Sequence, residues 1–123
     1  MILLVYDVTN PASFANLSRW VDMFRSVNPG KTLRGASQHT QCIRHPIWFS
    51  LLFSTGAVVA NKTDLDERAA VPATEGEAFA QRHELEFFQT SAKGNTNVDI
   101  PFMYLASQFK DAYEEQLLEF ASI

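Results

Sequence analysis

Cysteine and long apolar segments are scarce in this sequence, and each shortage excludes a class of protein. Cys42 is the only cysteine among 123 residues, which excludes an internal disulfide framework and a cysteine-based zinc cluster and agrees with a reducing compartment. The apolar residues 1–5 are too few for the core of a secretory signal, and they run straight into Asp7. No stretch has the roughly 20 apolar residues of a membrane span. We therefore expect a cytoplasmic protein.

Basic charge is also sparse. Ten Lys and Arg residues against 14 Asp and Glu residues give a net charge of -4, which leaves no electrostatic footprint for DNA, RNA or an anionic membrane. His39, Cys42 and His45 have a loosely ligand-like spacing, but a fourth ligand and a defined scaffold are missing. We therefore expect neither nucleic-acid binding nor a metal site.

The apolar pattern predicts an α/β fold with a parallel sheet and alternating helices. Mostly apolar runs over residues 2–8, 57–60 and 85–89 are typical of strands that are covered on both faces. Strands that alternate with helices imply right-handed crossovers and parallel pairing. The first strand is followed by Asn10, a good helix cap, and by Pro11, which is tolerated at the first helical position.

Helical spacing predicts three helices in this chain. The first runs from residue 11 to about residue 27, and we expect Trp20 to pack in the core. The second opens with a capping box at residues 74–77 and ends near residue 83. The third has Pro101 in its first turn, where a missing N–H is tolerated. Its apolar stripe comprises Phe102, Ala106, Phe109, Tyr113, Leu117 and Phe120.

Two short segments follow the second and third predicted strands and together provide the groups needed to bind guanine. They are Asn61-Lys62-Thr63-Asp64 and Thr90-Ser91-Ala92-Lys93. Guanine presents a ring N–H beside an exocyclic amine, so the single carboxylate of Asp64 can accept both hydrogen bonds. Adenine lacks that edge, and such a site discriminates by factors of about 10⁴. Both segments end parallel strands, where ligands bind in open α/β sheets.

The remaining residues of these segments have supporting roles in this hypothesis. Asn61 would tie the two loops together through its amide, and Ser91 would brace the first loop through its hydroxyl. Lys62 and Lys93 would lay their methylene stems along the two faces of the base, with their charges in water. The small Ala92 would leave its backbone N–H free for the guanine carbonyl. An ordinary surface turn would also explain Asn-Lys-x-Asp by itself, but the second segment favours the site.

The two segments resemble the guanine-specificity motifs Asn-Lys-x-Asp and Ser-Ala-Lys of the Ras superfamily of small GTPases. Residues 3–10, with Ser13, Phe14 and Trp20, resemble the fourth strand and third helix of a Rab-type domain. Among Rab-like proteins, the likeness is greatest to the Rab-like GTPases of intraflagellar transport. It rests on residues 28–30, 61–65, 70–71 and 85–86, and on Phe88, Pro101, Phe102, Leu105, Ala106, Gln108, Phe109 and Tyr113.

The resemblance implies that residues 1–123 are the C-terminal half of a Ras-like P-loop NTPase domain, from its fourth strand to its terminal helix. That fold has three layers, with helices on both faces of the sheet. Residues 36–56 do not match the family and form an atypical insert, which is uncommon inside a compact domain. Within it, residues 48–53 suit either a strand or an apolar segment with no site to bury in. A translated intron and a partner-binding loop both explain the insert.

The same resemblance implies that the nucleotide site is incomplete. The family cradles phosphates in a Gly-x-x-x-x-Gly-Lys-Ser/Thr loop and holds Mg²⁺ through hydroxyls of that loop and of the first switch. That pattern does not occur in the 123 residues. We expect no catalytic residue, weak binding of GTP or GDP by this chain alone, and Mg²⁺ only in a full-length parent. The strand over residues 2–7 would also leave an open apolar edge.

Two functions remain open at this point. The first is the guanine-recognising half of a Rab-like GTPase switch in intraflagellar transport, which would work in the cilium with a small companion subunit and other transport proteins. The second is a non-catalytic interaction module of the same ciliary complex. Rab proteins are anchored by prenylated C-terminal cysteines, and residues 120–123 contain none, so no lipid anchor is expected.

Overall fold

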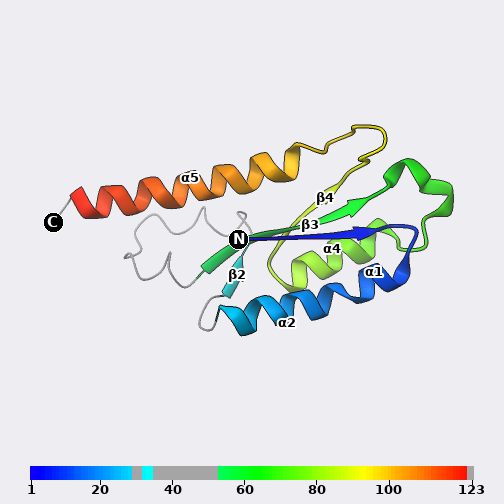
Figure 1. The fold of residues 1–123 in the computed structure, drawn as a ribbon, viewed down its shortest axis with the longest axis horizontal. Coiled ribbons are helices and arrows are strands. Elements are labelled where there is room, and N and C mark those ends of the chain that lie inside the picture. The colour runs from blue at the N-terminus through cyan, green and yellow to red at the C-terminus, as the bar shows by residue number, and fades with distance from the viewer. Residues whose placement is uncertain (29–31, 35–52, 122–123) are drawn as a thin grey trace.

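A parallel sheet with helices on both faces makes up the described part of the chain. The computed structural model describes residues 1–28, 32–34 and 53–121. In chain order the elements are β1 (Ile2–Asp7), α1 (Pro11–Ala15), α2 (Leu17–Val27), β2 (Thr32–Arg34), β3 (Phe53–Asn61), the 3₁₀ helix η2 (Thr63–Arg68), α4 (Ala73–Arg82), β4 (Glu86–Gln89) and α5 (Ile100–Ala121). Figure 1 shows α5 on one face of the sheet and α1, α2 and α4 on the other. The predicted three-layer α/β fold is confirmed.

Strand β3 is the centre of the sheet and has parallel neighbours on both sides. It pairs with β1 on one side and with β4 on the other, and its first residues also pair with β2. Within the described residues β1 pairs only with β3, so β1 is an edge strand. In the part of the chain that the structure describes, the open edge that the sequence predicts is therefore present.

Strand β3 begins four residues earlier than its apolar run indicates. Residues 53–56 read Phe-Ser-Thr-Gly and give no strand pattern, yet they extend β3, where residues 53–55 pair with β2. Neither this extension nor β2 was predicted, and the extension lies inside the predicted insert. Residues 36–52 of that insert, with His39, Cys42 and His45, lie outside the described residues.

The hydrophobic core fills the space between the sheet and the helices α1, α2 and α4. Alternate residues of β1 point into it, so Leu4 and Tyr6 are buried. Phe14 connects the layers, because its ring packs edge-on against Tyr6 at 5.0 Å and against Phe79 at 5.8 Å between centroids. The buried core cluster comprises Leu4, Tyr6, Val8, Leu17, Val21, Val58, Ala60, Val71, Phe79, Ala80 and Leu85.

The first predicted helix is present, but it differs from the prediction in two respects. Asn10 caps it as expected, since its side-chain Oδ1 accepts a hydrogen bond from the Ala12 N–H at 3.0 Å. The helix is interrupted at Asn16, which separates α1 from α2. Trp20 is 53% exposed, so its predicted core packing is wrong. At 3.6 residues per turn Trp20 lies roughly 60° from Leu17, on the flank that faces the open edge of β1.

Helix α4 starts without the predicted capping box. Its N-cap is Pro72, which makes no side-chain cap hydrogen bond, and Thr74 lies inside the first turn. Pro72 has an extended backbone, and its carbonyl accepts the Glu75 N–H at 3.1 Å. The helix therefore begins one residue before the predicted cap, and Thr74 is too far along the chain to act as one.

Helix α5 covers the opposite face of the sheet through its first turns. Pro101 is buried, and the Tyr104 ring packs 5.4 Å from that of Phe88 on β4. The apolar stripe predicted for this helix stays exposed. Its large members Phe102, Phe109, Tyr113, Leu117 and Phe120 are all about half exposed or more. No helix in the described ranges combines the length and apolarity that crossing a membrane requires.

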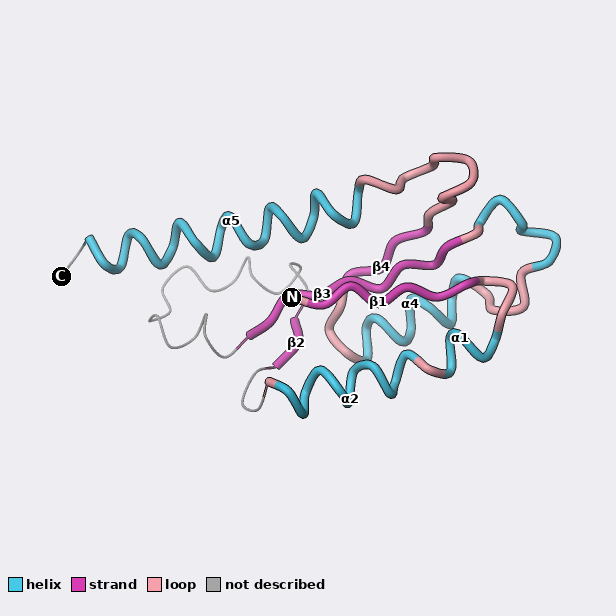
Figure 2. Tube along the Cα trace, viewed as in Figure 1, coloured by secondary structure: helices cyan, strands magenta, loops and turns pink. Residues whose placement is uncertain are grey.

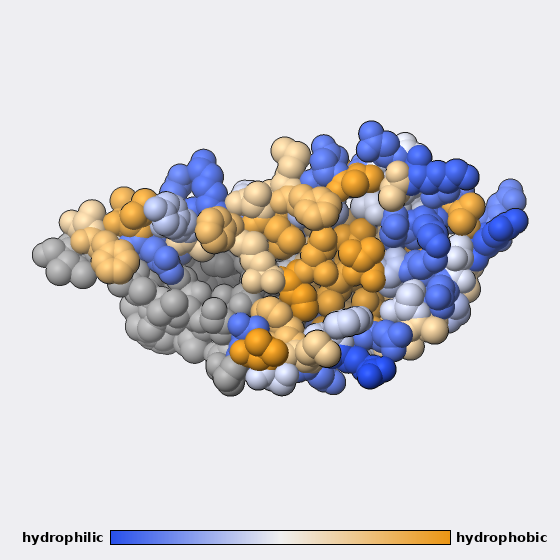
Figure 3. Space-filling model, in the orientation of Figure 1, coloured by the Kyte–Doolittle hydropathy of each residue, from blue (hydrophilic) through white to orange (hydrophobic). Residues whose placement is uncertain are grey.

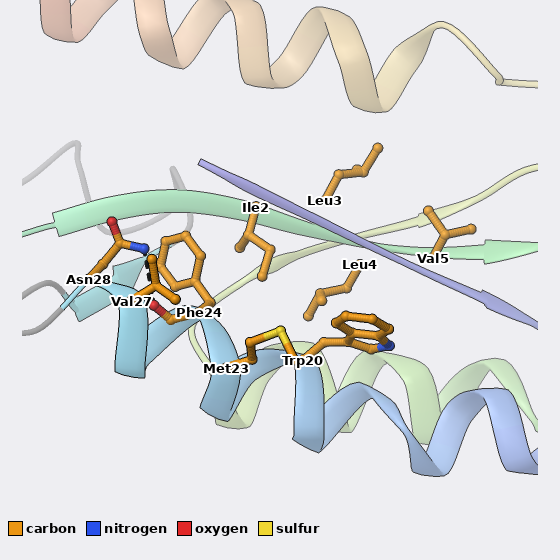
Figure 4. Close-up of a pocket in the computed structure, with 9 residues that line it drawn as sticks. All are labelled: Ile2, Leu3, Leu4, Val5, Trp20, Met23, Phe24, Val27 and Asn28. Carbon is orange, nitrogen blue, oxygen red and sulfur yellow. Dashed lines mark hydrogen bonds between the residues drawn. The ribbon is translucent and has the colours of Figure 1, made fainter.

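An apolar hollow of about 540 Å³ lies beside the open edge of β1. Figure 4 shows Trp20 and Met23 of α2 beneath it, while Leu3 and Val5 point toward the α5 side of the sheet. Apolar side chains gather between α5 and α2 in the space-filling view (Figure 3). Val5 is 52% exposed although it lies in the middle of a strand, so β1 offers apolar surface on the α5 side of the sheet.

Candidate functional site

The carboxyl ends of β1, β3 and β4 meet at one end of the sheet (Figure 2). The register is fixed there, because Asp7 of β1 lies opposite Asn61 of β3, and Ala60 lies opposite Gln89 of β4. The first predicted guanine-binding segment begins with Asn61, the last residue of β3, and the second segment follows β4 directly. The sheet therefore brings the two loops together as the sequence predicts.

Asp64 and Ser91 join the two loops by a short hydrogen bond. The Ser91 hydroxyl donates to Oδ1 of Asp64 at 2.6 Å and accepts the Gly94 N–H at 3.0 Å. Ser91 is only 3% exposed, whereas Asp64 is exposed at the rim. A buried hydroxyl thus orients an accessible carboxylate, which retains acceptor positions for a ligand. The predicted bracing of the first loop by Ser91 is confirmed.

Asn61 ties the same loops together through its side chain. Its Oδ1 accepts the Ala92 N–H at 3.2 Å and the Thr90 hydroxyl at 3.4 Å. The expected bridging by this amide is confirmed. The expectation that the Ala92 N–H is free is wrong, because the Asn61 carboxamide occupies it. A base carbonyl would have to share or replace that bond.

Two threonines that the sequence analysis did not single out complete the junction. The backbone N–H and the hydroxyl of Thr63 both donate to the Thr90 carbonyl, at 3.2 and 2.9 Å. The Ser91 backbone also pairs with Thr96 in both directions, at 3.0 and 2.9 Å. The sequence did contain a signal for Thr63 and Thr90. Each lies next to a motif residue, at the point where the parallel strands β3 and β4 end side by side.

Lys62 is anchored toward β1. Its ammonium contacts Oδ2 of Asp7 at 2.5 Å, and the Lys62 side chain is 51% exposed. The Lys62 side chain is exposed as expected, but its ion pair with Asp7 was not predicted. The hydrogen bond from Lys62, followed by those from Thr9, lowers the pKa of the Asp7 carboxyl to about 2. Asp7 thus contacts a residue of the candidate site, although the sequence analysis treated it only as the end of an apolar run.

Lys93 is exposed in the loop after Ala92, and its position over a base stays a prediction. Within the described part of the chain no group of three His, Cys, Asp or Glu residues is arranged to hold a metal ion. The arrangement as a whole offers an oriented carboxylate, two lysines and polar loop backbone at one rim. Such a set suits recognition of a planar base edge with adjacent N–H donors.

Comparison with known proteins agrees with this geometry. Residues 48–111 match the model of the Ras family. The chain is 38% identical over 123 residues to the Intraflagellar transport protein 27 homolog of Bos taurus and 37% identical to that of Homo sapiens, covering all of this chain and 55% of each relative. It is 36% identical over 115 residues to the Ras-related protein RABE1d of Arabidopsis thaliana, covering 93% of this chain and 43% of that protein.

The chain thus spans about half the length of the curated relatives that it matches. Its family match covers more than half of its residues and includes both guanine-motif segments. The Rab-like resemblance drawn from the motifs is confirmed, because the relatives include an Intraflagellar transport protein 27 homolog and a Ras-related protein. This chain belongs to the Ras family.

Proposed function

We propose that this chain is the guanine-recognising part of a Rab-like small GTPase. The hydrogen bond between the Ser91 hydroxyl and Asp64 Oδ1 at 2.6 Å is the observation that carries the proposal. It fixes one exposed carboxylate at the junction of two loops, and the family to which the chain belongs reads guanine with these motifs. In this proposal Asp64 accepts the two N–H donors of the base, while Lys62 and Lys93 flank its faces.

In this proposal, residues 1–123 bind the base of the nucleotide but not its phosphates. Bound GTP would supply a terminal phosphoryl group for hydrolysis, with Mg²⁺ held by the full-length parent. Residues 1–123 contain no Gly-x-x-x-x-Gly-Lys-Ser/Thr pattern, and base contacts add nothing at the reacting bond. We therefore propose that this chain alone binds guanine nucleotides weakly and does not hydrolyse GTP.

A nucleotide titration tests base recognition directly. We expect the chain to prefer GDP over ADP, with a dissociation constant well above about 1 μM. Asp64→Ala should abolish the preference. Asp66→Ala is the matched control, because Asp66 is an exposed carboxylate in the same 3₁₀ helix, and it should keep the preference. Equal preference in the wild type and in Asp64→Ala would refute base reading by Asp64, and submicromolar binding would refute the predicted weakness.

The relatives suggest the cellular setting. Two of them carry the name Intraflagellar transport protein 27 homolog, so we propose that the chain acts in intraflagellar transport at the cilium, with a small companion subunit and other transport proteins. A fluorescently tagged chain expressed in ciliated cells should concentrate along the cilium. A uniform cytoplasmic distribution would contradict this setting.

A non-catalytic interaction module is the second candidate. The exposed stripe of α5, with Phe102 58%, Phe109 62% and Phe120 67% exposed, favours it, because contiguous exposed apolar residues mark interaction surfaces. The two candidates differ in their dependence on Asp64. If Asp64→Ala leaves complex assembly intact in cells, the module is supported. If the variant abolishes assembly, the nucleotide switch is supported.

We also propose that the segment within residues 36–56 is an insert relative to the family domain. Residues 53–56 belong to β3, and the match to the Ras family begins at residue 48, so the part that remains unexplained is residues 36–47. Transcript reads that skip this part in some tissues would support a translated intron. Uniform inclusion in every transcript would support a partner-binding loop instead.

A further inference from the structure

Asp7 forms a rigid acceptor at the end of the edge strand. Its Oδ1 accepts the Thr9 N–H at 2.9 Å and the Thr9 hydroxyl at 2.7 Å, and its Oδ2 contacts the Lys62 ammonium. Its backbone is held as well, since the Asp7 N–H donates to the Ser13 hydroxyl oxygen at 3.0 Å. The Asp7 side chain is 22% exposed. A carboxylate fixed in this way holds its partner at low entropic cost.

Lys62 lies between two anchored residues and has an unusual backbone. Its φ of 66° and ψ of 34° are left-handed, which is uncommon for a residue other than glycine and is found where surrounding contacts enforce it. On one side Asn61 is the last residue of β3 and pairs with β1, and on the other Thr63 is bound to Thr90. The chain therefore turns sharply at Lys62.

This turn separates the charges of the Asn-Lys-x-Asp segment. Lys62 is drawn toward β1 by Asp7, while Asp64 is drawn toward the loop after β4 by Ser91. Lys62 and Asp64 are only two residues apart in sequence, yet among the described residues the lysine pairs with Asp7 and not with Asp64. A lysine without that partner would find Asp64 as the nearest carboxylate in sequence. Pairing with it would occupy acceptor positions that a base needs.

We propose that Asp7 is a positioning residue of the guanine site, which holds the Lys62 ammonium away from the Asp64 carboxylate and keeps the lysine stem on the β1 side of the base. This inference rests on the proposed function, because it assumes that Asp64 reads the base. Asp7 itself touches no ligand in this scheme. Its effect is transmitted through one side chain, and this property makes it separable from a general effect on the fold.

A double-mutant cycle tests the inference in the 123-residue chain. NMR titrations with GDP and ADP would be run on the wild type, Asp7→Asn, Lys62→Met and the double variant. We expect Asp7→Asn to weaken GDP binding by about threefold to fivefold, the size of effect expected for a partly exposed ion pair. In the Lys62→Met background the same change should have no further effect, since no ammonium remains to be positioned. Asp66→Asn is the charge-matched control and should leave binding unchanged.

Two binding outcomes would overturn the inference. Equal GDP affinity in Asp7→Asn and the wild type would show that Asp7 does not position the site. Equal weakening in both backgrounds would show that Asp7 acts through the fold and not through Lys62.

A ligand-free measurement separates this inference from the proposed function. If the wild type does not prefer GDP to ADP, base recognition fails, and the carboxyl ¹³C resonance of Asp64 then decides the role of Asp7. Relocation of the Lys62 ammonium in Asp7→Asn should shift that resonance, whereas Asp66→Asn should not. An Asp64 resonance that is the same in the wild type and in Asp7→Asn refutes the positioning role whatever the nucleotide result.

Discussion

Substitution of Ser91 by alanine should destabilise the protein through one buried hydroxyl. In the folded chain that hydroxyl donates to Asp64 Oδ1 at 2.6 Å and accepts the Gly94 N–H at 3.0 Å, and Ser91 is 3% exposed. The backbone pairing of Ser91 with Thr96 does not involve the side chain. Ser91→Ala should therefore remove two hydrogen bonds and leave the loop path intact.

The expected loss of unfolding free energy follows from the environment of each of the two hydrogen bonds. A hydrogen bond to a charged group contributes about 1.5–3 kcal/mol to stability and a neutral one about 1 kcal/mol. Asp64 and Gly94 are both exposed, so water recovers part of each loss and the lower ends of these ranges apply. We expect Ser91→Ala to lower the free energy of unfolding by about 2 kcal/mol.

Urea unfolding followed by far-UV circular dichroism measures this quantity. The dependence of the unfolding free energy on urea should stay the same, while the midpoint falls. Ser107→Ala, an exposed serine in α5, is the matched control and should change stability by less than about 0.5 kcal/mol. Ser91→Ala and Asp64→Ala should also be non-additive, because they share one bond. A loss below about 0.5 kcal/mol, or additive losses, would refute the assigned coupling.

Three further predictions concern the fold and its response to pH. Gly76→Ala should cost about 1–3 kcal/mol in urea unfolding, since the added Cβ would lie 2.6 Å from Cε2 of the Phe87 ring; a neutral effect would contradict this packing. The pKa of the Asp7 carboxyl is lowered from 3.8 to about 2, so its contribution to stability is complete above about pH 4 and is lost as the pH falls toward about 2. Asp7→Asn should therefore flatten that part of the acid unfolding curve. Burial, and secondarily the charge of Arg25, lowers the pKa of His83 below 6.5, so protonation favours the unfolded chain. The melting temperature should therefore fall as the pH drops below about 6.5. A His83→Gln variant with the same pH dependence as the wild type would contradict this assignment.

The strands that position the site could be predicted because their signals are local. Apolar runs located β1, residues 57–60 in the second half of β3, and β4, and Asn10 was a correct helix cap because its hydrogen bond spans only two residues. The two guanine-motif segments were placed together correctly for a related reason. Parallel strands align their carboxyl ends, so the residues that follow them become neighbours.

Most features that the sequence analysis missed depend on contacts distant in sequence. The exposure of Trp20 follows from an open sheet edge beside it, which helical spacing does not reveal. The Ala92 N–H is occupied by an amide 31 residues away, and Lys62 is paired with a carboxylate 55 residues away. For Ala92 and Lys62 the side-chain partner is thus set by the tertiary fold. The capping box failed for a local reason, because Pro72 starts the helix before Thr74.

The placement of Asp7 at the end of an edge strand has a dynamic consequence. Among the described residues β1 and β4 each pair only with β3, so each can fray separately, and fraying of β1 would release the Lys62 anchor while the pairing of β3 with β4 persists. The lysine side of the candidate pocket would then open independently of the Asp64 side. Amide hydrogen exchange along β1 would therefore report how long this half of the pocket persists.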